Sequence, residues 1–231
     1  MSYRNNNVKL VATMLLSLVL LVILAPNHIT LANPPALADK VISIADARSL
    51  PLGTIVTIDG SVTVASGAFS SSTFDQGFAI QDRTGGIYVS TSDNLGFAPR
   101  QQVRVTGTLA DTVLPGLLVL VDVTSVTAHG NGPKVQPLTV ATGDVGEATE
   151  GKIVSITGTI TQPVVNDLPF GFLIVVNDGS GDIDVFVAAS TGIDVSGLSQ
   201  GQTVQVTGFS GQFANNFEVD PRTQADIKVV P

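Results

Sequence analysis

GTIVTIDGSVT, residues 53 to 63, alternates apolar and polar residues as a half-buried strand does, and it carries a glycine in its middle. GKIVSITGTIT, residues 151 to 161, repeats the pattern with the glycine in the same place. Further blocks match in the same order, namely GFAIQD (77–82) with GFLIVVND (171–178), QDRTGGIYV (81–89) with NDGSGDIDVFV (177–187), and VRVTG (103–107) with VQVTG (204–208). The matched blocks are about 100 residues apart, and a repeat of that period suits two complete domains better than a solenoid.

The composition is typical of an all-β protein. The 231 residues include 23 glycines and 12 prolines, and they are 44% hydrophobic but only 13% charged. Val, Thr and Ile are abundant, as expected for strands joined by tight turns. We therefore predict two small domains, each with enough apolar surface to build a core.

Five strands are predicted in each copy of the repeat. In the first copy they lie near 54–65, 77–82, 86–90, 102–110 and 116–127, and in the second near 152–162, 171–177, 182–187, 202–209 and 216–229. Gly60 and Gly158 stand in the middle of the long first strands. A glycine there predicts a kink or bulge that lets one strand serve two sides of a small barrel.

The long kinked first strand, the tight second hairpin and the VxVTG fourth strand together resemble the OB-fold, a five-stranded Greek-key barrel that binds oligonucleotides or oligosaccharides. GFAIQDRTGGIYV (77–89) followed by QVRVTGTL (102–109) is similar to exported bacterial OB-like accessory domains of extracellular nucleases and phosphoesterases. The resemblance covers residues 42–230 as two copies. It implies a non-catalytic binding module whose ligand face is formed by the second and third strands of a barrel.

The sequence departs from the family pattern between the third and fourth strands, where many OB-folds place a helix. Residues 91–101 and 188–201 are interrupted by Gly and Pro and leave room for about one helical turn. Short helices are expected just before the first strand of each copy instead, at 43–51 and 142–150. Ser43 and either Thr142 or Asp144 are the candidate N-caps.

An apolar, uncharged run at residues 10–25 follows Arg4 and Lys9, which is the pattern of a signal peptide. Small residues permit cleavage after Ala32 or Ala38. The run is shorter than the roughly 20 residues of a transmembrane helix, although retention as an uncleaved anchor is the alternative. The predicted organisation is a signal peptide (1–38), a first barrel (39–128), a linker (129–138) and a second barrel (139–231), exported to the periplasm, cell surface or medium.

The charge balance restricts the class of ligand. Removing residues 1–38 leaves nine basic against 19 acidic residues, so the formal net charge moves from -8 to -10. Because neutralising phosphates supplies most non-specific affinity for nucleic acid, this balance argues against a general DNA or RNA binder unless the cations cluster. The absence of cysteine excludes disulfides, thiolate metal sites and cysteine nucleophiles.

The turns between the second and third strands combine aspartate with glycine. An aspartate side chain can accept hydrogen bonds from the turn backbone, and glycine accepts positive φ. We expect these roles for Asp82, Gly85 and Gly86 in the first copy and for Asp178, Gly179 and Gly181 in the second. The second turn also spaces oxygen ligands like the first half of a calcium loop, at Asp178, Ser180, Asp182 and Asp184. It has Ile183 at the position of the loop glycine and Ala189 at that of the bidentate glutamate, which favours an ordinary acidic turn without a cofactor.

One sequence motif suggests catalysis. GLSQG (197–201) fits the G-x-S-x-G pattern of esterases, which would make Ser199 a nucleophile. However, it leads into a strand, and His129 in the predicted linker is the only histidine left after signal removal. We predict that the chain is not an enzyme.

Candidate ligand contacts gather on the third strand and near it. If Ile87 and Val89 face the core, Tyr88 points out of the barrel, and its ring would be free to stack on a base or a sugar. The predicted ligand-binding residues are Tyr88, Arg83, Arg104 and Arg100 in the first copy and Phe186, beside Asp184, in the second. The predicted ligand is single-stranded nucleic acid or a glycan, and the alternative is a structural or protein-interaction role at the cell envelope.

Overall fold

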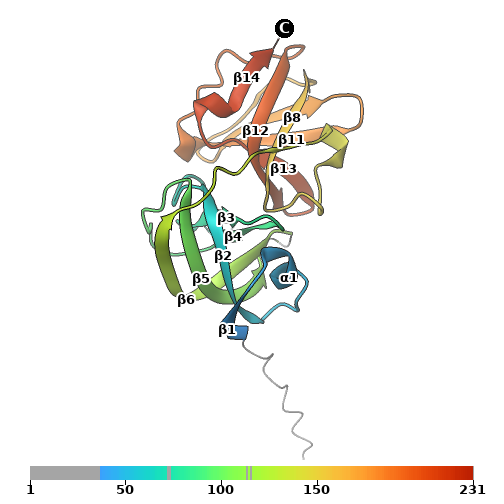
Figure 1. Cartoon of the computed structure of the whole chain (residues 1–231). Coiled ribbons are helices and arrows are strands. Elements are labelled where there is room, and N and C mark those ends of the chain that lie inside the picture. Colours follow the sequence, from blue (N-terminus) through green and yellow to red (C-terminus); the bar gives the residue numbers. More distant parts are fainter. Residues whose placement is uncertain (1–36, 72–73, 113, 115, 231) are drawn as a thin grey trace, which may run out of the picture. The chain divides into compact units, whose positions relative to one another are not determined.

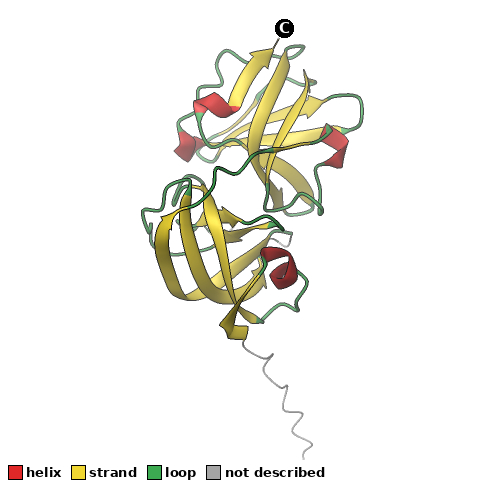
Figure 2. Ribbon diagram, viewed as in Figure 1, coloured by secondary structure: helices red, strands yellow, loops and turns green. Residues whose placement is uncertain are grey.

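The structure is a computed structural model that describes residues 37–71, 74–112, 114 and 116–230. It confirms an all-β fold with two closed five-stranded barrels in tandem (Figures 1 and 2). Both barrels belong to one compact unit, Pro34–Pro231. The predicted signal peptide lies outside the described residues except for Leu37 and Ala38, which begin a strand. Among the described residues, no helix is long and apolar enough to cross a membrane.

Barrel 1 is built from five strands of the first copy. These are β2 (Ile55–Val64), β3 (Phe78–Gln81), β4 (Gly86–Val89), β5 (Gln101–Asp111) and β6 (Leu118–Asn131). The sheet order is β2-β3-β4-β6-β5, and β5 closes the barrel by pairing with β2. The β4–β6 pair is parallel, as the order of an OB-like barrel requires.

Barrel 2 repeats this order with the second copy. Its strands are β8 (Ile153–Ile160), β10 (Gly171–Asn177), β11 (Asp182–Ala188), β12 (Thr203–Phe213) and β13 (Asn216–Asp220). The parallel pair is now β11–β13, and β12 closes the barrel on β8. The predicted strand at 216–229 is in fact two strands, because η3 (Gln224–Asp226) separates β13 from β14 (Ile227–Val230).

Three short strands extend the sheets beyond the predicted ones. They are β1 (Leu37–Ile42), which runs parallel to β2, β7 (Leu138–Thr139), which runs parallel to β8, and β9 (Val165–Asp167), which pairs with β10. Strand β6 continues to Asn131 and therefore contains the first residues of the predicted linker, His129 among them.

The short helices lie where they were predicted, and one of the predicted caps is correct. The Ser43 side chain accepts a hydrogen bond from the Asp46 amide and caps α1 (Ile44–Arg48). The 3₁₀ helix η1 (Thr142–Asp144) follows Ala141, which offers no side-chain cap. Thr142 instead bonds Asp178 in the β10–β11 turn, through its amide (3.1 Å) and its hydroxyl (2.8 Å). The predicted cap at Thr142 or Asp144 is therefore wrong. A further 3₁₀ turn, η2 (Ala189–Thr191), follows β11.

The two strand glycines allow close packing of the next strand. A Cβ at Gly158 would come within 2.8 Å of the Asn177 backbone, and one at Gly60 within 3.2 Å of the Gln81 backbone. The pairing of β2 with β3 shifts register between Val62 and Val64, just after Gly60. The predicted irregularity in the first strand is thus present in barrel 1.

The buried side chains form three clusters. One fills barrel 1 and includes Ile58, Ile87 and Val89, and one fills barrel 2. The third cluster takes residues from both copies, namely Val64, Phe69, Ala79, Tyr88, Leu117 and Val119 from the first and Ile153, Ala188 and Phe209 from the second. The two barrels therefore share apolar packing in addition to their separate cores.

Candidate functional site

Tyr88 is buried, so the prediction of an exposed ring is wrong. Ile87 and Val89 do face the core of barrel 1, and Tyr88 does point away from it. However, Tyr88 is only 1% exposed, because its ring packs against Phe69 and Phe209 at centroid distances of 6.3 and 6.2 Å. A ring covered in this way cannot stack on a base or a sugar.

Asp75 accepts a hydrogen bond from the Tyr88 hydroxyl and holds the loop that leads into β3. Tyr88 Oη donates to Asp75 Oδ1 at 2.7 Å, and the hydroxyls of Ser71 and Ser90 donate to Oδ2 at 2.7 and 2.5 Å. Burial alone would raise the pKa of Asp75, but the hydrogen bonds from Ser90, Ser71 and Tyr88 outweigh it and lower that pKa below its usual value. Burial and the Asp75 charge in turn raise the pKa of Tyr88.

The outer face of β3 and β4, which the family resemblance implies as the ligand face, is covered in barrel 1. Ala79 and Tyr88 point outward there and are packed with Ile153 and Phe209 of barrel 2. Polar contacts complete the cover, since Gln81 Oε1 accepts from the Ile153 amide at 2.9 Å. Arg48 Nη2 also donates to the buried Glu150 carboxylate at 2.8 Å.

The three predicted arginines are exposed but do not form one cluster with Tyr88. Arg104, on β5, is paired with Asp59 of β2 (3.2 Å), and His129 Nε2 lies 2.9 Å from the same carboxylate. Among the described residues, Arg83 in the β3–β4 turn and Arg100 before β5 form no ion pair. Only these two remain as uncompensated cations of the predicted set.

Phe186 occupies the position in barrel 2 that Tyr88 occupies in barrel 1. Each ring lies over a glycine of the neighbouring strand: a Cβ at Gly77 would meet the Tyr88 ring at 2.7 Å, and one at Gly171 would meet the Phe186 ring at 2.9 Å. Phe186 is only half-buried, and its neighbours on the outer face, Leu173 and Val175, also keep some exposure. The outer face of barrel 2 therefore stays partly open.

Carboxylates line this open face along the parallel pair β11–β13. Asp184 pairs in register with Glu218, and Asp220 follows on the same side of β13. Burial, followed by the charge of Asp184, raises the pKa of Glu218 to about 7. Burial and the charge of Glu218 raise the pKa of Asp220, and burial and Asp182 raise that of Asp184. We call Asp184, Glu218 and Asp220 the acidic row.

A small cavity of about 40 Å³ lies at the end of the acidic row. Its lining residues include Glu218 and Asp220, Ser70 and Ser71 of the loop before β3, and the aromatic residues Phe69, Tyr88, Phe209 and Phe213. Asp220 is 7% exposed, and its Oδ1 atom has no hydrogen-bond partner. Among the described residues, no Lys or Arg lines this cavity.

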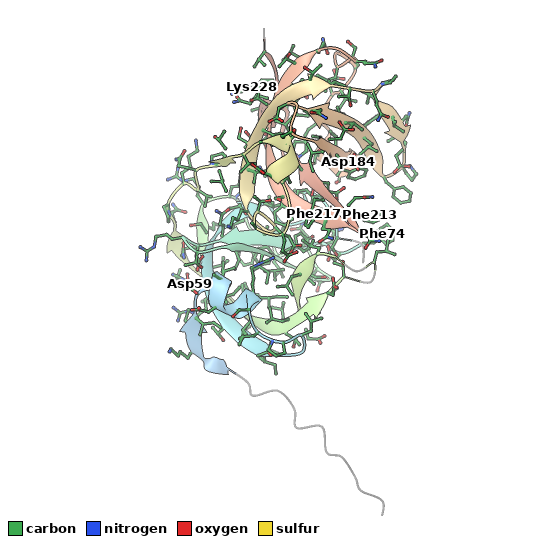
Figure 3. The ribbon with its side chains drawn as sticks, turned by 90° about the vertical axis from the view of Figure 1, so that its right-hand side faces the viewer. Asp59, Phe74, Asp184, Phe213, Phe217 and Lys228 are labelled. Atoms are coloured by element: carbon green, nitrogen blue, oxygen red, sulfur yellow. The ribbon has the colours of Figure 1, made fainter. Side chains whose placement is uncertain are left out.

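Exposed phenylalanines lie beside the acidic row. Phe74 and Phe170 are 74% and 54% exposed, and their rings contact each other at a centroid distance of 6.2 Å. Phe170 directly precedes Gly171, over which the Phe186 ring lies. Phe213, 49% exposed, lines the acidic cavity, and Figure 3 shows Phe74, Phe213 and Asp184 in one region of the view, away from Asp59. We call Phe74, Phe170 and Phe213 the ring rim.

A second hollow, a groove of about 640 Å³, lies on barrel 1 between the segment after β4 and strand β6. It is lined by hydroxyl and aliphatic side chains with Asp93 and Asp122, and it contains none of the predicted ligand residues. Among the described residues that line it there is neither an aromatic ring nor a cation.

The acidic turn of the second copy is held by its own hydrogen bonds. Asp178 accepts from the Ser180 hydroxyl and amide and from Thr142, and the Ser180 bonds are the main cause of its lowered pKa. Asp182 Oδ1 accepts from the side-chain Nδ2 of Asn177 at 2.6 Å. Among the described residues, no group of three or more His, Cys, Asp or Glu side chains is arranged to hold a metal ion.

Ser199 and His129 lie in different barrels. Ser199 is exposed in the loop before β12, where its amide donates to Gln202 Oε1 at 2.7 Å. His129 is on β6 and contacts Asp59. Among the described residues, no hydrogen bond connects the two, so this pair lacks the nucleophile–base geometry of an esterase.

The chain matches no protein-family model, and no curated protein matches it. Its structure is similar to that of a murine DNA binding protein solved with double-stranded DNA, with 11% identity, a TM-score of 0.39, and coverage of 76% of this chain and 96% of that one. Fission yeast Pot1, solved with single-stranded DNA, has 11% identity and a TM-score of 0.37 over 81% of this chain and 87% of that one. The hypothetical protein ygiW from E. coli has 21% identity and a TM-score of 0.31 over 39% of this chain and 90% of that one. Because these TM-scores are low, at most 0.39, the fold is assigned from the pairing of the strands within each barrel and not from these similarities.

The acidic row and the ring rim include residues that sequence patterns alone did not single out. NFEVD, residues 216–220, alternates acids with apolar residues, which places Glu218 and Asp220 on one face. That alternation was the available signal, but it does not show that β13 runs parallel to β11. Asp75, Phe74 and Phe170 lie in or beside loops, where no period indicates which way a side chain points.

Proposed function

We propose that the chain is a non-catalytic binding module whose ligand lies on the outer face of barrel 2 and on the ring rim. One observation carries this proposal: the equivalent face of barrel 1 is covered through Tyr88, whereas that of barrel 2 keeps Phe186, Leu173 and Val175 partly exposed. Contiguous exposed apolar side chains on a soluble domain mark interaction sites.

The backbone at the ring rim supports a functional role. Phe74 has φ of 56°, a left-handed conformation that costs a non-glycine residue on the order of 1 kcal/mol. Its ring is nevertheless 74% exposed, so burial of the ring does not offset this cost. A strained, exposed aromatic residue is consistent with selection for a ligand contact.

A neutral oligosaccharide fits the chemistry of this face best. Aromatic rings stack on the apolar faces of sugars, and carboxylates such as that of Asp184 accept hydrogen bonds from hydroxyl groups. Among the described residues that line the cavity at the end of the acidic row, none is a cation that would neutralise phosphates. A polyanion would therefore meet the charge of the acidic row unopposed.

Titration with a neutral glycan array tests this proposal. Phe170→Ala should weaken glycan binding by roughly 5- to 100-fold, the loss expected for one stacking ring. Asp184→Asn should weaken it less, and Arg83→Ala, on barrel 1, is the matched control that leaves it unchanged. Glycan binding that survives Phe170→Ala would contradict the site. Absence of glycan binding would contradict the ligand and favour a protein-interaction role at the cell envelope.

Single-stranded nucleic acid is a second candidate ligand, favoured by the unpaired, exposed Arg83 and Arg100. The resemblance to accessory domains of exported nucleases agrees with it. Two arginines support only micromolar, salt-sensitive binding against the acidic background. Fluorescence titration with a short oligonucleotide at low salt, on wild type and on the double variant Arg83→Ala, Arg100→Ala, tests it, and binding that the double variant retains would refute the site.

We propose that the module has no catalytic activity of its own. The separation of Ser199 from His129 supports this. Assays with nuclease, esterase and glycosidase substrates should show no turnover. Turnover that is lost in Ser199→Ala or Asp178→Ala would contradict it.

A further inference from the structure

The carboxylate of Asp220 is buried without a partner. Asp220 is 7% exposed, its Oδ1 atom has no hydrogen-bond partner, and the side chain lines the acidic cavity. A bare acceptor in the interior is costly, and a bare charge is more costly still. A ligand that supplies positive charge to this carboxylate would reduce the cost.

The charges around Asp220 increase this cost instead of offsetting it. Glu218 lines the same cavity from the same strand, and Asp184 pairs in register with Glu218. The nearest arginine in sequence, Arg222, directs its guanidinium to Asp226 (2.9 Å) and to the carbonyl of Thr63 (3.1 Å). Arg48 is likewise engaged, with Glu150. Among the described residues that line the acidic cavity, none is a Lys or an Arg.

The size and the donors of the cavity define the kind of ligand. About 40 Å³ accommodates one ion or one water molecule but not a lysine or arginine side chain. The polar lining residues offer oxygen donors, chiefly the carboxylates of Glu218 and Asp220, with Ser70, Ser71 and Gln212 beside them. We propose that the acidic cavity binds a single Ca²⁺ ion through Glu218 and Asp220.

Calcium fits this donor set better than other common metals. Zinc and copper prefer nitrogen and sulfur ligands, and the described lining residues include neither His nor Cys. Magnesium requires a near-octahedral shell, whereas Ca²⁺ accepts six to eight oxygens of mixed type in irregular geometry. The site would hold the ion through two carboxylates, with neutral oxygens completing the shell.

This site goes beyond the proposed function, because it does not depend on a glycan or a nucleic acid. Ser70 and Ser71 belong to the loop before β3 of barrel 1, and Glu218 and Asp220 belong to β13 of barrel 2. A bound ion would therefore connect the two barrels and increase their stability together.

Tyr88 provides a direct optical probe of the cavity. The protein has no tryptophan and two tyrosines, of which Tyr88 lines the cavity and Tyr3 lies outside the described residues. Terbium(III) substitutes for Ca²⁺ at oxygen sites and luminesces when a nearby excited tyrosine transfers energy to it. Titration of the full chain with terbium, excited through tyrosine, should give a saturable signal that excess Ca²⁺ removes and excess Mg²⁺ does not. Tyr88→Phe should abolish the signal.

Variants separate this site from the acidic turn. Asp220→Asn should abolish both the terbium signal and the rise in Tm of about 5 °C that saturating Ca²⁺ gives the wild type. Asp178→Asn, in the turn, is the matched control and should keep both. Asp220→Asn removes a buried charge, so the variant is expected to fold and to be at least as stable as the metal-free wild type. A wild type without a Ca²⁺-dependent Tm, or a response that Asp178→Asn removes and Asp220→Asn retains, would overturn the proposal.

Discussion

The same position of the two barrels carries Tyr88 in one and Phe186 in the other, and the difference between them follows their surroundings. Tyr88 is buried and its hydroxyl donates to Asp75, so the ring is anchored at both ends. Phe186 has no hydroxyl and remains half-buried on the open face. Sequence alternation predicted correctly that Tyr88 points out of its barrel. It could not show that residues far along the chain cover the ring.

Asp75→Asn should destabilise the protein by about 2 kcal/mol at pH 7. The carboxylate accepts hydrogen bonds from Ser71, Tyr88 and Ser90, and an amide can replace only some of them. Because the folded-state pKa of Asp75 is lowered, its contribution is present above the unfolded value of about 3.8 and is lost as the pH falls through the folded value. Urea unfolding of both proteins at pH 7 and below pH 3 measures the difference, which should shrink in acid. The exposed Asp93→Asn is the control, and an equal difference at both pH values would contradict the role of the carboxylate.

At the scale of elements, the matched hairpins look alike in sequence but use their glycines differently. In the second copy, Gly179 and Gly181 have φ of 102° and 156°, as predicted. In the first, Asp82 bonds the turn as expected, yet neither Gly85 nor Gly86 has positive φ, so that part of the prediction is wrong. Gly86 is required for close approach instead, because a Cβ there would lie 1.9 Å from the carbonyl oxygen of Gly151.

Most strands of the barrels could be predicted from a period of two residues together with the turn residues that bound them. Strands β7 and β9 have two and three residues, too few to show a period, and were missed. Strand β1 was also missed, because its first two residues belong to the predicted signal peptide. The break between β13 and β14 was also missed, although Pro221 directly after β13 was a signal for it. Element type was therefore predictable where the pattern is long, and the ends were not.

Gly86→Ala should destabilise the protein by roughly 2 kcal/mol or more, because the backbone of Gly151 cannot move aside without displacing β8. Gly197→Ala is the matched control, since a Cβ at Gly197 meets nothing within 4 Å. Thermal unfolding of the two variants measures the effect. Equal melting temperatures for the two variants would show that the close approach of Gly86 to Gly151 does not require a glycine.

Strand β1 bears on the predicted cleavage of the signal peptide. Cleavage after Ala38 would remove the first two residues of β1 (Leu37–Ile42), whereas cleavage after Ala32 leaves the strand whole. We therefore expect a mature N-terminus at Asn33. Mass spectrometry of the protein purified from its own cells and medium identifies it, and an intact Met1 or an N-terminus at Asp39 would contradict this expectation.

At the scale of the whole molecule, the sequence predicted two barrels but not what lies between them. The repeat and the strand count were sufficient for the fold, because each barrel is specified by its own alternation. The acidic cavity and the cover over Tyr88 depend on packing between the copies, which leaves no periodic signal in either one. For this reason the exposure predicted for the Tyr88 ring was wrong, whereas Arg83, Arg100 and Arg104 are exposed. The open face of the second copy was represented among the predicted ligand residues by Phe186 alone.

The apolar cluster that both barrels share should hold them together when the predicted linker is cut. Proteolysis should cut the chain first within residues 132–137, which lie between β6 and β7 outside any strand and are largely exposed. The two fragments should stay together, because Tyr88, Ile153 and Phe209 are each about 1% exposed in a cluster that both barrels build. Gel filtration of the nicked protein without denaturant should therefore give one peak containing both fragments.

Phe209→Ala should weaken the association of the two fragments, since it removes a buried ring from the centre of the contact. Two separate peaks for the nicked wild type would show that the barrels are independent modules that need only the linker to remain together.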